Sequence, residues 1–159
     1  MAKNTKTNAM RMLERAKIAY ETREYEYDEG DLSGTTIAKN AGLDAQMVFK
    51  TLVAKGDKTG IIVMCIPVEK EVDLKKAASV SGNKKVEMLH VKDLLQTTGY
   101  IRGGCSPVGM KKSFPTYFDT SVLSCDKIAV SAGVRGCQLL VKSNELISYL
   151  KAKTENIIM

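Results

Sequence analysis

The chain has 159 residues, of which 44% are hydrophobic and 26% are charged, proportions that are ordinary for a globular protein. This length suits one domain, residues 1–159, with a sizeable core. No apolar run reaches the roughly 20 residues that a membrane span needs, and the lysines of the N-terminus are not followed by the apolar stretch of a secretory signal. We therefore expect a cytoplasmic protein without membrane association.

The positive charge is unevenly distributed. The chain carries 24 Lys and Arg against 18 Asp and Glu, a net charge of +6. Residues 21–31 hold six acids and one arginine, a local charge of −5, so the rest of the chain carries +11. Such a balance is typical of proteins with an anionic partner, nucleic acid being the commonest. Plain solubility is the alternative, and the acidic segment reads equally well as a solvated edge strand.

Helices and strands alternate irregularly along the chain. Periodicity and turn residues predict, in chain order, a helix over 9–18, a strand over 20–27, a short helix over 35–42, strands over 48–54 and 60–66, helices over 72–79 and 91–97, strands over 116–119, 128–131 and 138–141, and a last helix capped by Ser143. This order lacks strict βαβ alternation. It favours an α+β fold in which a mixed, mostly antiparallel, barrel-like sheet is flanked by helices.

One segment, Arg102–Gly109, is rich in glycine and is called the glycine loop below. Three glycines and one proline in eight residues exclude a helix. Glycine pairs occur where the backbone takes positive φ or approaches another group closely. The loop therefore suits a rigid cradle for an anionic or polar ligand, and a tight structural turn is the alternative.

Lys50 interrupts the apolar strand predicted over 48–54. Alternation places it on the same side as Val48 and Leu52. An ammonium on an apolar face needs a partner, because burying it unpaired is unfavourable. We interpret Lys50 either as a cation at the floor of a cleft or as a lysine whose stem crosses an edge to reach water.

A second turn, Ser131–Gly136, is called the serine turn. It follows a predicted strand and contains two glycines and Arg135, which is suited to bind phosphate through two parallel hydrogen bonds. Other chemistry has little support. The single histidine, His90, fits a structural place at a helix start, and the four cysteines form no metal-binding pair.

Several segments recur together in one known family. They are Val48–Val53, Lys75–Ala78, Lys84–Met88, Thr98–Gly109 and Val130–Gly136. In this order they resemble the YbaK/EbsC family of free-standing aminoacyl-tRNA deacylases, in particular its Cys-tRNA(Pro) deacylase branch, over residues 5–150. The resemblance implies a compact α+β editing domain that requires neither a metal nor another cofactor.

The resemblance also implies which residues act. It assigns catalytic roles to Lys50 and Gly103 and substrate-binding roles to Tyr25, Tyr100, Gly104, Ser106, Pro107, Ser131, Gly133 and Arg135. Cys105 stands at a variable position of the family's loop. The family uses no cysteine nucleophile there, so we expect Cys105 to be a small side chain turned into the core.

The implied reaction is hydrolysis of the ester that joins cysteine to tRNA(Pro) mischarged by prolyl-tRNA synthetase, with Cys-tRNA(Cys) as a further candidate substrate. In this family the substrate's own thiol is thought to attack the ester carbonyl. The implied partners are the acceptor end of tRNA(Pro) and the synthetase, with the protein a monomer or a dimer. Two alternatives stay open: a deacylase for another small amino acid, such as alanine, and a non-catalytic module that binds RNA or nucleotides.

Overall fold

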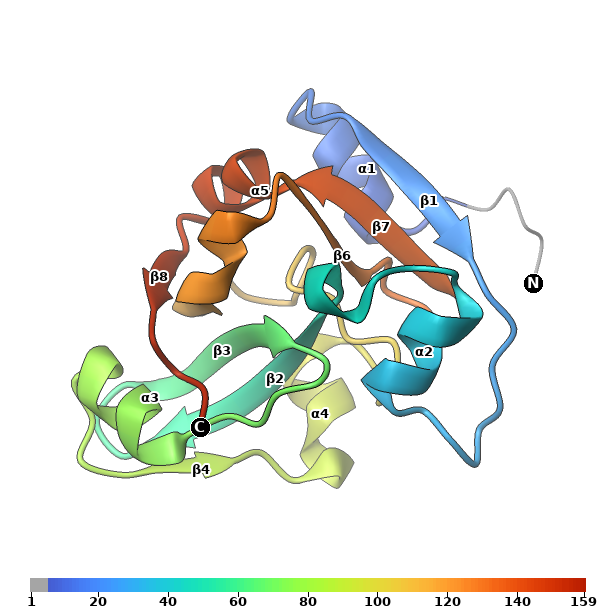
Figure 1. The fold of residues 1–159 in the computed structure, drawn as a ribbon. Helices are drawn as coiled ribbons and strands as arrows, with labels where there is room; N and C mark the ends of the chain where they lie inside the picture. Colours follow the sequence, from blue (N-terminus) through green and yellow to red (C-terminus); the bar gives the residue numbers. More distant parts are fainter. Residues whose placement is uncertain (1–5) are drawn as a thin grey trace.

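The computed structural model describes residues 6–159 and arranges them as helices around two adjoining sheets (Figure 1). The helices are α1 (Asn8–Arg15), α2 (Gly34–Asn40), α3 (Leu74–Ser81), α4 (Val91–Thr98) and α5 (Ser143–Leu150), with short 3-10 turns η1 (Ala45–Met47) and η2 (Thr120–Ser124). The strands are β1 (Tyr20–Glu24), β2 (Phe49–Gly56), β3 (Gly60–Pro67), β4 (Val86–Met88), β5 (Thr116–Asp119), β6 (Lys127–Ser131), β7 (Cys137–Lys142) and β8 (Lys153–Glu155).

The strands form one sheet of three, ordered β1-β7-β6, and one of five, ordered β4-β2-β3-β5-β8. Pairing is antiparallel except between β3 and β5 and between β5 and β8. The sheets meet at a parallel bridge between Val48 and Ala129. The mixed, mostly antiparallel α+β architecture is thus confirmed, although the two sheets do not close into a barrel.

The main apolar core lies between α1, α5 and one face of the three-stranded sheet. Leu13 of α1 and Leu146 of α5 pack in the same buried cluster as Leu139 of β7 and Phe49 of β2. On the opposite face of that sheet, α2 covers a smaller cluster that includes Leu140. The three-stranded sheet is therefore covered on both faces. On the face covered by α2, Ala129 and Leu140 pack in one cluster with Val48, which precedes β2.

The predicted elements are confirmed, although several of their ends differ; α1, for example, ends at Arg15 rather than at residue 18. β1 ends at Glu24, so Tyr25 and Tyr27 belong to the segment that follows it. Ser143 does not cap α5: the cap residue is Lys142, and the Ser143 hydroxyl donates to the carbonyl oxygens of Cys125 and Asp126. That prediction was wrong because a hydroxyl at a helix start can serve a neighbouring turn instead of its own helix.

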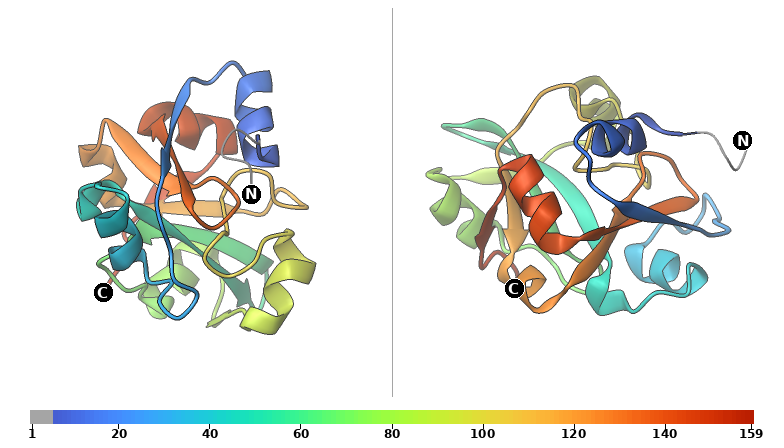
Figure 2. Two further views of the ribbon diagram at one scale, coloured as in Figure 1. Left: turned by 90° about the vertical axis from the view of Figure 1, so that its right-hand side faces the viewer. Right: turned by 90° about the horizontal axis from the view of Figure 1, so that it is seen from above.

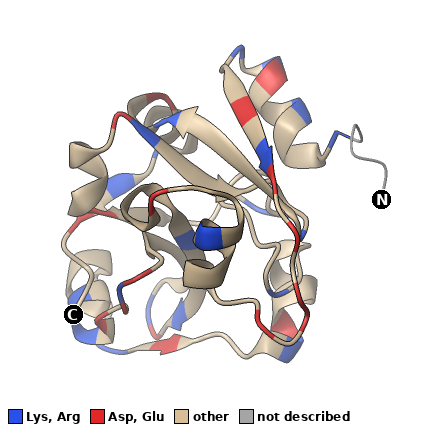
Figure 3. Cartoon of the chain, turned by 45° about the vertical axis from the view of Figure 1, so that its right-hand side comes forward, with Lys and Arg blue, Asp and Glu red and all other residues tan. Residues whose placement is uncertain are grey.

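The acidic segment runs along the edge of the fold. β1 is an edge strand whose residues after Tyr20 are all exposed, and Figure 3 shows the positions of Asp and Glu along it and along the loop toward α2. The expectation of a solvated edge strand is confirmed for residues 20–24. Among the described residues, no helix has the length and apolar character to cross a bilayer.

Candidate functional site

Lys50 lies where the two sheets meet. A parallel bridge pairs Val48, two residues before Lys50, with Ala129, two residues before Ser131. On the other side of Ser131, the antiparallel pairing of β6 and β7 places Gln138 directly opposite. Three polar side chains from three strands are thus gathered at the junction.

These three residues open onto one cavity of about 550 Å³, called the junction cavity below. Its wall is formed by part of the glycine loop, the start of α2, the first half of β2 and the residues before and within the first turn of α4. The polar residues that line it are Ser33, Thr35, Lys50, Thr51, Glu69, Glu71, Arg102, Cys105, Ser131 and Gln138. Gly103 also lines it. The structure therefore brings together Lys50, Gly103 and Ser131, which the sequence had singled out separately.

The ammonium of Lys50 is only loosely paired. Its side chain is 26% exposed, and Nζ lies 3.8 Å from Oε1 of Glu71, whose side chain is 77% exposed. An ion pair with a partner so exposed contributes little, because water and salt screen it. Lys50 can therefore bind an anionic or carbonyl-bearing ligand in the cavity without breaking a strong internal contact.

The two glycines of the pair differ in their surroundings. Gly103 takes φ +84° and lines the cavity. Gly104 is buried, and its N–H donates to the carbonyl of Ile101 at 2.9 Å, so it is not free to hold a ligand. Ser106 is also fully buried, and its Oγ accepts from Val108 N within the loop, while the neighbouring Pro107 is buried as well.

The glycine loop and the serine turn touch through their main chains, as the left view of Figure 2 shows. A Cβ built on Gly104 would lie 3.2 Å from the carbonyl carbon of Val134. The guanidinium of Arg135 donates from Nε to the carbonyl of Arg102 at 2.9 Å. Arg135 therefore fastens one turn to the other, and this contact occupies one of its donors.

Neither of the tyrosines that the sequence analysis named lines the junction cavity; Tyr25 lines a second cavity, described below. The hydroxyl of Tyr100 donates to the carbonyl of Val108, and its ring packs against Gly133. Tyr25 is 9% exposed, and burial raises the pKa of its hydroxyl. The Gln138 side chain next to it acts in the opposite direction and lowers that pKa.

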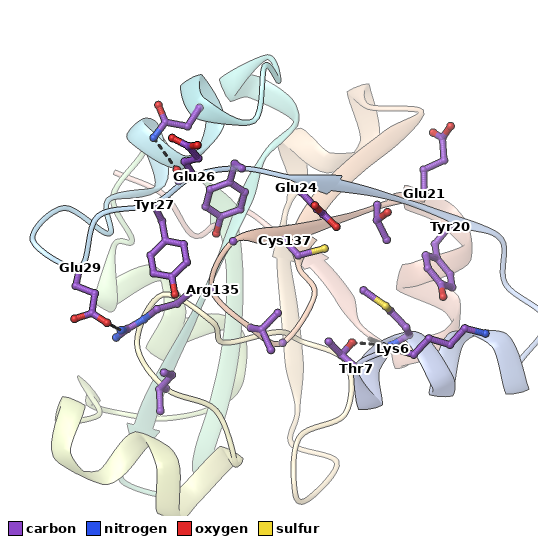
Figure 4. A pocket seen from close by; sticks show the side chains of 18 residues that line it. Lys6, Thr7, Tyr20, Glu21, Glu24, Glu26, Tyr27, Glu29, Arg135 and Cys137 are labelled. Carbon is purple, nitrogen blue, oxygen red and sulfur yellow. Dashed lines mark hydrogen bonds and ion pairs between the residues drawn. The ribbon is translucent and has the colours of Figure 1, made fainter. Parts of the chain in front are cut away.

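A second, more open cavity of about 1280 Å³ lies between β1, α1 and the serine turn (Figure 4). Four glutamates line it, namely Glu21, Glu24, Glu26 and Glu29, and Glu29 holds a contact of 3.5 Å with Arg135. Gly133 and Arg135 face this cavity rather than the junction cavity. Its carboxylates would repel an anionic ligand, so the smaller junction cavity is the better candidate site.

Cys105 lines the junction cavity, so the expectation that it turns wholly into the core was incomplete. Burial raises the pKa of its thiol to about 12. The thiol is therefore protonated at neutral pH and is a poor nucleophile, because the thiolate is the reactive form.

Gln138 is the one polar residue of the junction that the sequence analysis missed. It is 4% exposed and stands in the otherwise apolar strand β7. The signal that drew attention to Lys50, a polar side chain within an apolar strand, was present here too. It was overlooked because an amide carries no charge.

The fold and this cavity define an α+β domain with a main-chain-walled ligand site, and comparisons with known proteins place it in a family. Residues 33–149 match the model of the aminoacyl-tRNA editing domain, and the chain belongs to that family. A protein of Enterococcus faecalis named "Putative Cys-tRNA(Pro)/Cys-tRNA(Cys) deacylase EbsC" is 52% identical over 143 residues, which cover 90% of this chain and 87% of that protein.

More distant relatives share the fold. The uncharacterized protein YwhH of Bacillus subtilis is 25% identical over 82% of this chain and 85% of its own length. Among solved structures, "a putative trans-editing enzyme for prolyl tRNA synthetase" superposes with a TM-score of 0.81 at 20% identity, covering 98% of this chain and 99% of that one. The hypothetical protein APE2540 superposes with a TM-score of 0.84 at 18% identity, covering 94% and 97%.

Packing of Tyr100 against the serine turn predicts a large effect of a small substitution. Gly133 has φ +99°, and a Cβ there would lie 3.0 Å from the Tyr100 ring, whereas Gly42 has φ +69° and nothing within 4 Å. We expect Gly42→Ala to lower the free energy of unfolding by roughly 1–2 kcal/mol from backbone strain alone. Gly133→Ala should lower it by roughly 1–3 kcal/mol more, because the ring must move. Equal denaturant midpoints for the two variants would show that Tyr100 does not pack as described.

The protonated state of Cys105 predicts that its thiol is dispensable. We expect Cys105→Ala to retain at least a third of the wild-type rate in whatever reaction the cavity supports. We also expect alkylation of Cys105 by iodoacetamide to accelerate only as pH approaches the raised pKa of about 12. Fast alkylation at pH 7 together with an inactive but folded alanine variant would instead identify Cys105 as a nucleophile.

Proposed function

We propose that this protein is an aminoacyl-tRNA deacylase that removes cysteine from mischarged tRNA(Pro). The editing-domain family and the name of the 52%-identical relative support this activity. The observation that carries the proposal is the loosely paired ammonium of Lys50, which lies in one cavity with Gly103 and Ser131. A cavity that contains a partly buried cation and is lined by a glycine of the loop suits an ester attached to a phosphate-bearing RNA end.

The substrate supplies the reactive sulfur in this proposal. The cysteinyl thiol attacks its own ester carbonyl, a carbon–sulfur bond forms, the bond to the tRNA 3′ oxygen breaks, and that oxygen takes up the proton. Cysteine leaves as a cyclic thiolactone, which water then opens. The protein's contribution is alignment, and alignment of reacting groups can supply ~7–11 kcal/mol of the barrier.

Two protein groups position the ester. Lys50 holds the phosphate or ribose region of the terminal nucleotide through a charge-assisted contact. The main chain at Gly103 holds the aminoacyl carbonyl, where negative charge develops during attack. Ser131 lines the same cavity as Lys50. Its Oγ accepts a hydrogen bond from Gly133 N at 3.1 Å, so its own proton stays available for the ligand.

The tRNA approaches as an anion. The positive charge outside residues 21–31 attracts its acceptor arm, and the carboxylates along β1 keep the arm away from the larger cavity. Affinity should fall as salt rises, because each phosphate contact releases counterions. Selection of tRNA(Pro) then comes from a transient complex with prolyl-tRNA synthetase. Equal deacylation of Cys-tRNA(Pro) and Cys-tRNA(Cys), unaffected by added synthetase, would contradict that selection.

Replacing Lys50 tests the cavity directly. We expect Lys50→Ala to fold normally by circular dichroism and thermal melting and to lose at least ~100-fold in kcat/KM on Cys-tRNA(Pro), because the charge-assisted contact is lost. Lys55→Ala is the matched control, since Lys55 lies exposed on the same strand and away from the cavity. Retained activity in Lys50→Ala would remove Lys50 from the site.

Substrate-assisted cleavage predicts dependence on the amino acid's thiol. We expect rapid release of cysteine from tRNA(Pro) and, under the same conditions, rates at least ~100-fold lower for serine, alanine and proline, since a hydroxyl or methyl group cannot replace the sulfur nucleophile. Radiolabelled aminoacyl ester decay measures this. Alanine released faster than cysteine would assign the protein to alanine editing, and binding of all four substrates without hydrolysis would make it a binding module.

A further inference from the structure

Gln138 leaves one end of its amide without a partner. Its Oε1 is fully buried and makes no hydrogen bond with any described residue, although the side chain lines the junction cavity. A desolvated acceptor without a donor is destabilising by roughly 1–3 kcal/mol, so buried polar atoms are almost always paired. An exception on the wall of a ligand cavity indicates that the ligand supplies the missing donor.

The position of this oxygen is well determined by its surroundings. β7 is the central strand of its sheet, and Gln138 pairs with Ser131 on one side and with Arg23 on the other. The Tyr25 hydroxyl lies next to its side chain, and the Gln138 amide acts to lower the pKa of that hydroxyl, the direction expected of an N–H donor. The nitrogen end thus lies toward Tyr25, and the oxygen end has no partner among the described residues.

The polar groups around Gln138 indicate which part of the ligand donates to its oxygen. Lys50 and the main-chain amide of Gly103 are themselves donors, so they serve the acceptor atoms of an ester. The carboxylates of Glu69 and Glu71 also face the cavity, but both side chains are exposed at its rim and Glu71 is next to Lys50. Within the buried part of the cavity, Gln138 therefore provides an acceptor among donors.

We propose that Gln138 Oε1 accepts a hydrogen bond from the α-amino group of the aminoacyl ester bound in the junction cavity. This inference rests on the function proposed above. An aminoacyl ester offers two acceptor oxygens, a weakly donating thiol and an amino group, and the amino group carries N–H donors whether or not it is protonated. Gln138 would then be a positioning residue that orients the amino acid through its α-amino group, which amino acids in general share.

A substrate without the amino group tests the proposal separately from the structural role of Gln138. The two substrates are Cys-tRNA(Pro) and 3-mercaptopropionyl-tRNA(Pro), which keeps the thiol and the ester but lacks the amine. We expect Gln138→Met to lose roughly 10- to 100-fold in kcat/KM on the first substrate, the range for a hydrogen bond to a charged group. On the second substrate the loss should be less than threefold, because there is no amine to lose. Gln138→Glu, which keeps an acceptor, should retain more activity than Gln138→Met.

Controls keep every outcome informative. Gln46→Met makes the same substitution at an exposed glutamine of η1 outside the cavity and should leave both rates unchanged. An equal loss on both substrates in Gln138→Met would overturn the proposal in favour of a purely structural role. If Gln138→Met does not fold, the wild-type protein still decides: equal cleavage of the two substrates overturns the proposal. Cleavage of neither by the wild type would instead contradict the proposed deacylase function.

Discussion

Main-chain contact between the glycine loop and the serine turn is the constraint on which the candidate site depends. The carbonyl carbon of Val134 comes so close to Gly104 that no side chain fits between the two segments without displacement. Arg135 then fastens the serine turn to the Arg102 carbonyl, and the Tyr100 ring packs against Gly133 on the same turn. These contacts make a rigid wall from segments about 30 residues apart in the chain. Opposite this wall, the bridge between Val48 and Ala129 brings in β2 and with it Lys50.

The electrostatics of the junction cavity match this construction. Lys50 has only an exposed carboxylate nearby, so its charge is not neutralised within the protein. Gln138 presents an acceptor that is not satisfied within the protein. The cavity thus offers a donor, the Lys50 ammonium, and an acceptor, Gln138 Oε1, that the protein itself leaves without strong partners. It is complementary to a ligand that carries both an acceptor and a donor, such as an amino acid linked to a phosphate-bearing chain. The junction cavity has only the exposed carboxylates of Glu69 and Glu71 at its rim, whereas four glutamates line the larger cavity, where they oppose anionic ligands.

Much of this arrangement could be predicted from the sequence, and the remainder depends on tertiary contacts. Strand and helix positions followed from periodicity, and Lys50 was conspicuous as a charge within an apolar strand. The three-residue strands β4 and β8 were missed because so short a run has no measurable period, and β8 forms only by pairing with β5. Sequence treats Gly103 and Gly104 alike, but only the folded loop shows that the amide of Gly104 is already bonded to Ile101.

The state of Cys105 bears on how the proposed reaction must proceed. Burial raises the pKa of this thiol to about 12, and burial of a substrate thiol in the same cavity would likewise disfavour its thiolate. A substrate sulfur there would rest as the neutral thiol, except where the positive charge of Lys50 lowers its pKa. Its proton must therefore be lost as the sulfur attacks, and the departing 3′ oxygen of the tRNA is a nearby base strong enough to receive it. Sulfur, carbonyl carbon and leaving oxygen then have to be aligned within one small space. Alignment of this kind requires rigid walls and few catalytic side chains, which is the kind of site that the two glycine-containing turns form.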